Sequence, residues 1–213
     1  MKNTDPLCAK IRSESDVVTG PAVLNNGYRI VSSYSVPLPE STQRDGSSAP
    51  LGIAVDIGTT TLAMELIDSL RGAVLSSVSL LNSQRRWGSD VISRIRAANA
   101  GNNMALPKAI HADVIDGVMR LARAAGVDGN RITRLVVSAN TTMAHLFLGL
   151  SCSGMGQAPF LPEKTEYPEL SFYDLFDCVP DSALPSSECT VAVIPSLSAF
   201  IGGDIVGGVS LLD

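Results

Sequence analysis

The sequence predicts an α/β domain whose mixed sheet carries helices on both faces, and three observations support this prediction. First, strand-like runs at 51–58, 61–69 and 73–82 follow one another with only short connections, which is typical of antiparallel neighbours. Second, the hydrophobic period changes after Asn82 from two to about 3.6. Third, later strand-like runs alternate with helical segments, as in sheets extended through crossover helices. We therefore expect a three-strand antiparallel meander followed by crossover-connected strands.

The first two helical segments have recognisable boundaries. A short helix is expected from Val91 with Gly101 as its stop signal. A longer helix over 107–125 has Pro107 in its first turn and Gly126 at its end. The apolar residues expected on the buried faces are Val91, Ile92, Ile95 and Ala98 in the first helix and Ile110, Val114, Val118, Leu121 and Ala125 in the second.

The rest of the chain continues the alternation. A buried strand is expected over 131–139 and a helix over 141–150. A stretch with four prolines between 159 and 180 is typical of an irregular surface excursion. A strand over 190–196 and a glycine-rich apolar helix over 197–212, running to the end of the chain, complete the domain.

The first part of the chain has a different character. A short apolar patch at 28–36 is followed by a segment at 37–50 that is rich in proline, serine and charge, which is typical of a linker. We expect residues 1–49 to be an N-terminal tail or linker remnant and residues 50–213 to form the domain.

Composition and charge limit the function classes. The 213 residues are 45% hydrophobic and 17% charged, as in folded globular proteins. A net charge of -5 argues against nucleic acid or an anionic membrane as a partner. No run approaches the roughly 18 apolar residues of a membrane span, and the polar first residues have no signal-peptide core. The expected location is the cytoplasm.

The cysteines and histidines do not indicate a metal site. Cys8, Cys152, Cys178 and Cys189 are scattered without C-x-x-C spacing, so we expect no iron–sulfur cluster in this chain. His111 and His145 lie inside helical patterns, where packed or surface histidines are the commoner case.

The end of the first strand carries the most informative motif, GIAVDIGTTT at 52–61. Glycine alone suits a hairpin turn, and threonines favour strands, so Gly58 and the threonines Thr59, Thr60 and Thr61 have an ordinary structural explanation. Alternatively, backbone N–H groups and hydroxyls in such a turn can bind phosphate, with Asp56 holding Mg²⁺ directly or through water. Neither a P-loop motif nor a dinucleotide-binding G-x-G-x-x-G motif is present.

A strand, the D-x-G-T-T-T segment, two antiparallel strands and then alternating helices and strands resemble the ATPase superfamily of actin, Hsp70 and sugar kinases. This resemblance implies an actin-like (ribonuclease H-like) lobe. In the superfamily two such lobes close on ATP, and each gives one phosphate loop. By this resemblance Asp56 and Gly58 to Thr61 would bind the phosphates and Mg²⁺.

Five segments in order over 51–212 resemble, more closely, the ATPase domain of the reductive activators of corrinoid proteins. They are LGIAVDIGTTT, LNSQRRWGSDVISRI, VVSANTTMAHLFLGL, PFLP and IPSLSAFIGGDIVGG. The resemblance implies that ATP is coupled to reduction of inactive Co(II) to Co(I) for methyl transfer, with a corrinoid protein or methyltransferase as partner.

The sequence departs from that family in two ways. Family members commonly carry an N-terminal ferredoxin-like domain with an iron–sulfur cluster, and the first 50 residues here contain no cysteine cluster. The chain also ends at Asp213, before a second phosphate loop. We therefore expect the first lobe alone, a fragment that is an ATPase only if a second lobe or a homodimer completes it.

Further residues are assigned from their surroundings. Asp204 lies in an apolar segment, where an unpaired carboxylate should face a cleft or a partner. The resemblance implies that Asp204 orients the attacking water or a Mg²⁺-bound water, with Gly202 and Gly203 allowing close approach; a cap or an interhelix hydrogen bond is the alternative. Asn140 and Thr141 are either an N-cap or part of the cleft lining.

A polar segment after the third strand is a candidate partner surface. It contains Asn82, Gln84, Trp87 and Asp90. An exposed tryptophan beside arginines suits an interface, although a half-buried tryptophan capping the sheet fits equally well.

Two other functions remain open. One is a small-molecule kinase of the same superfamily, and the other is a non-catalytic interaction remnant that binds no nucleotide.

Overall fold

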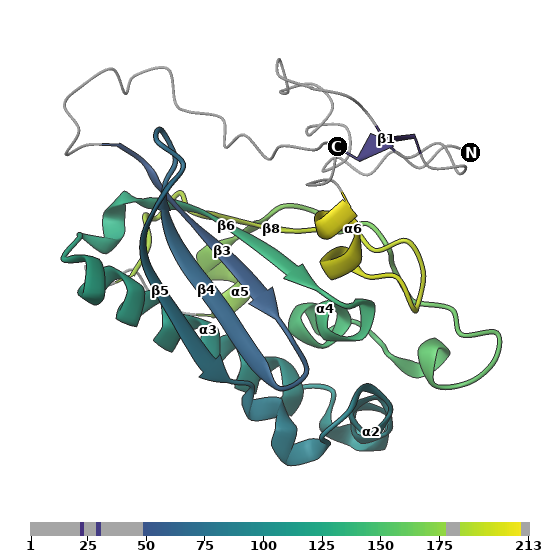
Figure 1. The fold of residues 1–213 in the computed structure, drawn as a ribbon. Coiled ribbons are helices and arrows are strands. Elements are labelled where there is room, and N and C mark those ends of the chain that lie inside the picture. Colours follow the sequence, from purple (N-terminus) through teal and green to yellow (C-terminus); the bar gives the residue numbers. More distant parts are fainter. Residues whose placement is uncertain (1–21, 24–28, 31–48, 178–183, 210–213) are drawn as a thin grey trace.

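The computed structural model describes residues 22–23, 29–30, 49–177 and 184–209, and it contains a six-stranded sheet in the order β5-β4-β3-β6-β8-β7 (Figure 1). The strands are β3 (Leu51–Ile57), β4 (Thr61–Asp68), β5 (Ala73–Leu81), β6 (Ile132–Ala139), β7 (Leu170–Ser171) and β8 (Thr190–Val193). The short strands β1 (Ala22–Val23) and β2 (Arg29–Ile30) form a separate antiparallel pair. Most of the expected tail at 1–49 lies outside the described residues.

The predicted mixed sheet and its antiparallel meander are confirmed. β3 pairs antiparallel with β4, and β4 pairs antiparallel with β5. β6 lies parallel to β3 on its other side, and β8 lies parallel to β6. Along β3, buried Ile53, Val55 and Ile57 alternate with half-buried Ala54 and exposed Asp56, because successive side chains of a strand point to opposite faces. Asp56 is therefore on the face away from the main core.

The helices are α2 (Val91–Ala97), α3 (Ala105–Ala125), α4 (Thr141–Leu148), α5 (Phe172–Phe176) and α6 (Gly203–Val209). Shorter helical turns occur at Ser83–Trp87, Ala98–Asn102, Gly129–Arg131 and Ser153–Gly156. None of the helices within the described residues is long and apolar enough to cross a bilayer.

The core face of the sheet is covered by α3, α4 and α5 (Figure 1). α3 packs tightly on β4 and β5: a Cβ atom at Gly117 would collide with the sulfur of Met64, and the Ser76 hydroxyl donates a 3.0 Å hydrogen bond to the Leu121 carbonyl. Aromatic side chains join the helices, with the rings of Phe147 and Phe176 6.0 Å apart. The apolar stripe predicted for the long helix is confirmed at Ile110, Val114, Val118 and Leu121, all fully buried, while Ala125 is half-buried.

The expected burial of Ile92 is wrong, since 48% of its surface is exposed. The inward face of α2 is formed by Ile95, with Ala98 just beyond the helix end, and also by Arg94, which is fully buried. At about 100° per residue these positions share one side of the helix, and Ile92 lies well outside it. A charged residue occupies a position that the apolar pattern did not include.

The last helix differs from its prediction. It begins at Gly203, not at residue 197, because 197–202 form a turn in which the Leu197 amide donates to the Ile201 carbonyl at 2.8 Å. Gly207 of α6 lies beside Ile194, which lines the same hollow of the sheet as Asp56. α6 therefore covers part of the face opposite α3, as expected for helices on both faces.

Other boundaries also changed. The strand expected over 190–196 ends at Val193, and the helix expected over 141–150 ends at Leu148, where Gly149 takes the left-handed conformation that commonly ends a helix. The proline-rich stretch contains β7 and α5.

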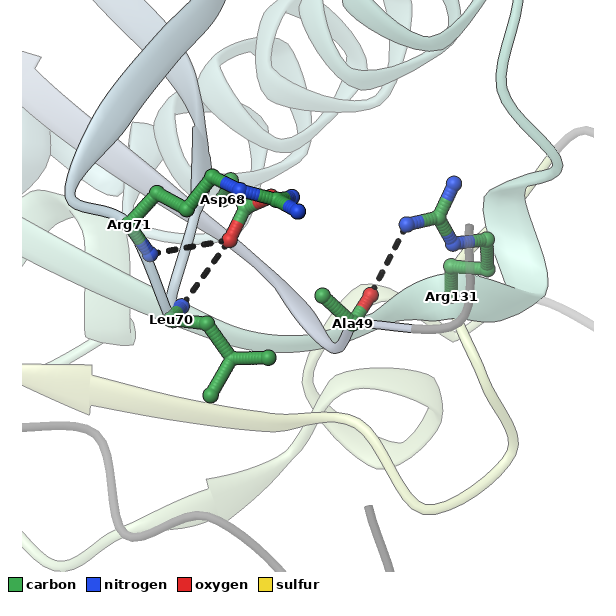
Figure 2. Close-up of polar contacts among 5 residues, drawn as sticks. All are labelled: Ala49, Asp68, Leu70, Arg71 and Arg131. Carbon is green, nitrogen blue, oxygen red and sulfur yellow. Dashed lines mark hydrogen bonds and ion pairs between the residues drawn. The ribbon is translucent and has the colours of Figure 1, made fainter. Parts of the chain in front are cut away.

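The end of the sheet opposite the Asp56 loop is closed by a polar turn between β4 and β5, shown in Figure 2. The Asp68 carboxylate accepts hydrogen bonds from the amides of Leu70 and Arg71, each at 3.0 Å, and pairs with the Arg71 guanidinium at 2.8 Å. At the same end, Arg131 donates to the Ala49 carbonyl at 2.9 Å. These contacts fix the start of β3 and the start of β5.

Candidate phosphate-binding site

The loop between β3 and β4 is a tight turn that requires glycine. The Gly58 amide donates to the Thr61 carbonyl at 2.9 Å, and a Cβ atom on Gly58 would lie 2.9 Å from that same oxygen. Real Cβ atoms essentially never come so close to a backbone oxygen, so any side chain at Gly58 would distort the turn.

Three successive carbonyl groups of this loop accept hydrogen bonds from residues inside the domain. The Asn82 side-chain amide donates to the Gly58 oxygen at 2.8 Å, and the Asn82 backbone amide donates to the Thr60 oxygen at 2.9 Å. The Thr59 oxygen accepts a hydrogen bond from the Arg94 guanidinium. All three loop oxygens therefore have donors within the domain.

This anchoring leaves the loop amides available. In a trans peptide the C=O and N–H groups point in opposite directions, so anchoring the oxygens of Gly58 and Thr59 turns the N–H groups of Thr59 and Thr60 the other way. Within the described part of the chain, neither of these two N–H groups makes a hydrogen bond. Two adjacent free amides in a glycine turn are a donor set suited to phosphate oxygens.

The residues that hold the loop are buried. Asn82, Gln84 and Arg94 each have 0% exposure. The Gln84 amide donates to the Asn82 side-chain oxygen at 2.9 Å, and the Gln84 side chain donates to the Leu106 carbonyl at 3.0 Å. The expected partner-surface role of Asn82 and Gln84 is therefore wrong for this structure, because both side chains lie inside the domain and support the loop.

Two carboxylates near the loop are close enough to influence each other electrostatically. Asp56 is exposed at the end of β3, and Asp204 is exposed in the first turn of α6. Although its side chain is exposed, Asp56 is partly desolvated by the surrounding protein, which raises its pKa, and repulsion from Asp204 raises it further. A divalent cation would relieve that repulsion, and carboxylate oxygens are the ligands that Mg²⁺ prefers, so the pair fits a magnesium ion.

Asp56 also borders a hollow of about 430 Å³ on the sheet face opposite α3. Its polar lining comes from Asp56, Glu65, Ser77, Ser79 and Ser138, and the apolar part includes Val136 and Ile194. Through Asp56 the hollow reaches the end of β3, next to the loop between β3 and β4.

Gly202 and Gly203 lie against the ends of strands β6 and β8, and their expected place in the lining of a nucleotide cleft stays a prediction. A Cβ atom on Gly202 would lie 2.7 Å from the Ala139 oxygen, and one on Gly203 would lie 2.7 Å from the Ile194 oxygen. The glycines thus let the segment before α6 touch the ends of β6 and β8, which brings Asp204 toward Asp56.

Asn140 and Thr141 have structural roles at the start of α4. The Asn140 side chain caps the helix by accepting from the Met143 amide at 3.0 Å. Thr141 is 1% exposed, and its hydroxyl donates to the Ser198 carbonyl at 2.6 Å. Thr141 therefore fastens the segment before α6 and does not line an open cleft, whereas Asn140 is half-buried beside Gly202.

Trp87 and Asp90 lie near the surface. Trp87 is half-buried; its ring nitrogen donates to Asn102 at 3.2 Å, and the Arg86 guanidinium lies 3.9 Å from the ring centre. Asp90 is exposed and caps α2 by accepting from the Ser93 amide at 2.8 Å. A partner-binding role for Trp87 and Asp90 stays a prediction.

The described residues contain no group of three or more His, Cys, Asp and Glu side chains that could hold a metal ion. Cys152 and Cys189 are buried, and burial raises the pKa of each thiol to about 12. Cys8 and Cys178 lie outside the described residues. Burial lowers the pKa of both His111 and His145, which keeps these packed imidazoles neutral.

Sequence reasoning missed Arg94. The available signal was a cationic residue on the otherwise apolar side of a helix, next to Ile95. Buried arginines need several acceptors, and two of those of Arg94, the Met143 sulfur and the Thr59 carbonyl, come from distant segments that the sequence pattern does not place.

Comparisons with known proteins agree with one another. A family model described as the RACo middle region matches residues 51–213. The chain is 36% identical over 156 residues to the corrinoid activation enzyme RamQ of Eubacterium limosum, a match that covers 72% of this chain and 25% of RamQ. A solved structure of a reductive activator for corrinoid, iron-sulfur protein matches with a TM-score of 0.69 and 30% identity, covering 76% of this chain and 25% of that protein. The chain thus spans about a quarter of the length of each relative.

Proposed function

The chain belongs to the family of the RACo middle region, and we propose that it supplies one side of an ATP-binding site in a cytoplasmic reductive activator of corrinoid proteins. The actin-like fold expected from the sequence is the one found, with the predicted meander and the predicted parallel strands.

The free N–H groups of Thr59 and Thr60 are the observation that carries the proposal. They lie in a turn whose carbonyl groups all accept hydrogen bonds from the domain. The N–H donors of the loop are therefore already oriented before a ligand binds. Preorganised donors bind an anion more tightly than donors that must first be ordered. Phosphate oxygens of ATP are the anions that suit this loop.

Magnesium fits the same site. Asp56 and Asp204 would hold it, directly or through bound water, and Asp204 could also orient the attacking water. When bound, the ion would neutralise phosphate charge during hydrolysis. The repulsion from Asp204 that raises the pKa of Asp56 supports this assignment, because a bound cation would offset both negative charges.

The activation step follows from the relatives. One is named a corrinoid activation enzyme and the other a reductive activator for corrinoid, iron-sulfur protein. We propose a corrinoid protein or its methyltransferase as the partner, with ATP binding or hydrolysis coupled to reduction of Co(II) to Co(I). Phosphoryl transfer needs donors on both sides of the phosphates, so turnover would require a second lobe or a second copy of the chain.

Calorimetric titration of the 213-residue chain with Mg-ATP and Mg-ADP tests the proposal. We expect binding by the wild-type chain and about tenfold weaker binding by Asp56→Asn, because a charge-assisted contact is lost. Asp116→Asn is the matched control, since Asp116 lies on α3 in an exposed ion pair with Arg120 at 2.8 Å. A folded chain that binds no nucleotide, or one whose affinity is unchanged in Asp56→Asn, would contradict the proposal.

A further inference from the structure

Arg94 is a buried cation whose contacts are all neutral. Its Nε donates to the Gly88 carbonyl at 2.9 Å, and one terminal nitrogen lies 3.5 Å from the Gln84 side-chain oxygen and 3.2 Å from the Met143 sulfur. The other terminal nitrogen donates to the Thr59 carbonyl. Arginine remains protonated in proteins, so these neutral acceptors surround a full positive charge.

Within the described residues, no carboxylate pairs directly with this charge. Among the described residues, no acidic side chain lies within ion-pair distance of the Arg94 guanidinium. Burial lowers the pKa of Arg94, and the charge of Asp90, which caps the same helix, only partly opposes that shift. A buried charge without a counter-charge destabilises a folded protein. Such a charge calls for an explanation, and an anion that binds nearby is one.

The Arg94 guanidinium is hydrogen-bonded directly to a carbonyl group of the phosphate-binding loop. The Thr59 carbonyl, which accepts from Arg94, belongs to the same peptide group as the free N–H of Thr60. A hydrogen bond to the oxygen of a peptide polarises its N–H and makes it a stronger donor. The effect of the Arg94 charge is therefore directed, through one peptide group, at the point where a phosphate would bind.

We propose that Arg94 is a positioning residue of the phosphate-binding loop, and that the phosphates of the bound nucleotide are the counter-charge of its buried guanidinium. The inference rests on the proposed function, because it assumes that the loop binds phosphate. It adds that Arg94 orients the Thr59–Thr60 peptide and strengthens it as a donor. The contribution of Arg94 to affinity should therefore increase with the negative charge of the ligand.

Calorimetric titrations of the 213-residue chain with Mg-ATP and with Mg-ADP test this inference in four proteins: wild type, Arg94→Gln, Arg94→Lys and Arg96→Gln. Arg96 is the matched control, since it lies exposed on the same helix and its substitution removes the same charge. Thermal unfolding without nucleotide measures the stability of each variant separately from binding.

We expect Arg94→Gln to weaken Mg-ATP binding by about tenfold or more, as for loss of a hydrogen bond from a charged donor. The loss should be smaller for Mg-ADP. Arg94→Lys should recover part of the Mg-ATP affinity because the charge is retained, and Arg96→Gln should bind like the wild type. A merely structural role would lower the unfolding temperature without this dependence on charge.

Three outcomes would overturn the inference. A folded Arg94→Gln chain with wild-type affinity would do so, as would equal losses in Arg94→Lys and Arg94→Gln. If Arg94→Gln does not fold, the lysine variant decides: measurable Mg-ATP binding supports the role of the charge, and none in a folded chain refutes it. Failure of the wild-type chain to bind nucleotide would instead refute the proposed function on which the inference rests.

Discussion

Gly202 lies so close to Thr141 that a Cβ atom built on the glycine would stand 2.5 Å from the Thr141 amide nitrogen. The same atom would lie 2.7 Å from the Ala139 oxygen. The segment before α6 is thus pressed onto the junction of β6 and α4. This contact sets where α6 begins, and so sets the position of Asp204 relative to Asp56.

Replacing Gly202 with alanine should destabilise the domain by about 1–3 kcal/mol, the range for overpacking a close contact. The added methyl group meets backbone atoms, which cannot move aside as a flexible side chain would. Urea unfolding followed by circular dichroism measures the change. Gly52→Ala is the control, because the nearest atom to its Cβ is a serine hydroxyl at 3.4 Å. Equal urea midpoints for Gly202→Ala and the wild type would disprove the close contact.

Asp56 should make the nucleotide-free protein less stable at neutral pH than at acid pH. Burial and then Asp204 raise its pKa in the folded state above the ordinary value of 3.8, so the folded state binds the proton more tightly than the unfolded state. The stabilisation by this proton is complete below 3.8 and is lost as the pH rises through the folded-state pKa.

Asp56→Asn should therefore raise the thermal midpoint at neutral pH and leave it nearly unchanged well below pH 3.8. Thermal unfolding over a pH series, without Mg²⁺, provides the measurement. Asp204→Asn should act in the same direction, and the double variant should gain less than the sum, because one repulsion is removed in both cases. A lower midpoint for Asp56→Asn at neutral pH would contradict the assignment.

Asp68, at the other end of the sheet, should show the opposite dependence. Burial alone would raise its pKa, but hydrogen bonds from Arg71 and Leu70 and the Arg71 charge outweigh burial and lower it. Its stabilising contribution is present above the ordinary value of 3.8 and is lost as the pH falls through the lower folded-state pKa.

Asp68→Asn should lower the thermal midpoint at neutral pH and have little effect in strong acid. Arg71→Ala is the comparison, because it keeps both backbone hydrogen bonds and removes only a guanidinium side chain that is 57% exposed. Exposed ion pairs contribute at most about 1 kcal/mol, so Arg71→Ala should be the milder change. A larger loss in Arg71→Ala than in Asp68→Asn would show that the ion pair, not the turn, matters.

Asn82→Ala should both destabilise the domain and weaken phosphate binding. It removes the donor to the Gly58 carbonyl and the acceptor of the Gln84 amide, and leaving such buried groups unpaired costs about 1–3 kcal/mol each. Urea unfolding and titration with Mg-ATP measure the two effects. Asn103→Ala, at an exposed asparagine, should change neither. Unchanged Mg-ATP affinity in Asn82→Ala would show that the loop holds its shape without this anchor.

Local chemistry made much of the fold predictable. Alternation along 51–57 and the short turns around Gly58 and Gly72 were enough to place the meander. The stripe from Ile110 to Leu121 was enough to orient the long helix. In each case neighbours in sequence are also neighbours in space.

Long-range contacts explain what the sequence did not predict. Asn82 and Gln84 are polar residues directly after a strand, a pattern typical of surfaces, and only the fold shows that the loop and Leu106 surround them. The burial of Arg94 was missed for the same reason, since two of its acceptors, Thr59 and Met143, are distant in sequence. The start of α6 depended on the packing of Gly202 against Thr141, which no local pattern contains.

The pairing of β3 has a consequence for the order of folding. Its antiparallel partner β4 begins at Thr61, whereas its parallel partner β6 begins only at Ile132. Short hairpins close within microseconds, but a contact across so long a segment must first overcome the entropy of closing a large loop. The meander can therefore form early during synthesis. The loop between β3 and β4 reaches its final shape later, once Arg94 of α2 is in place and β6 has joined the centre of the sheet.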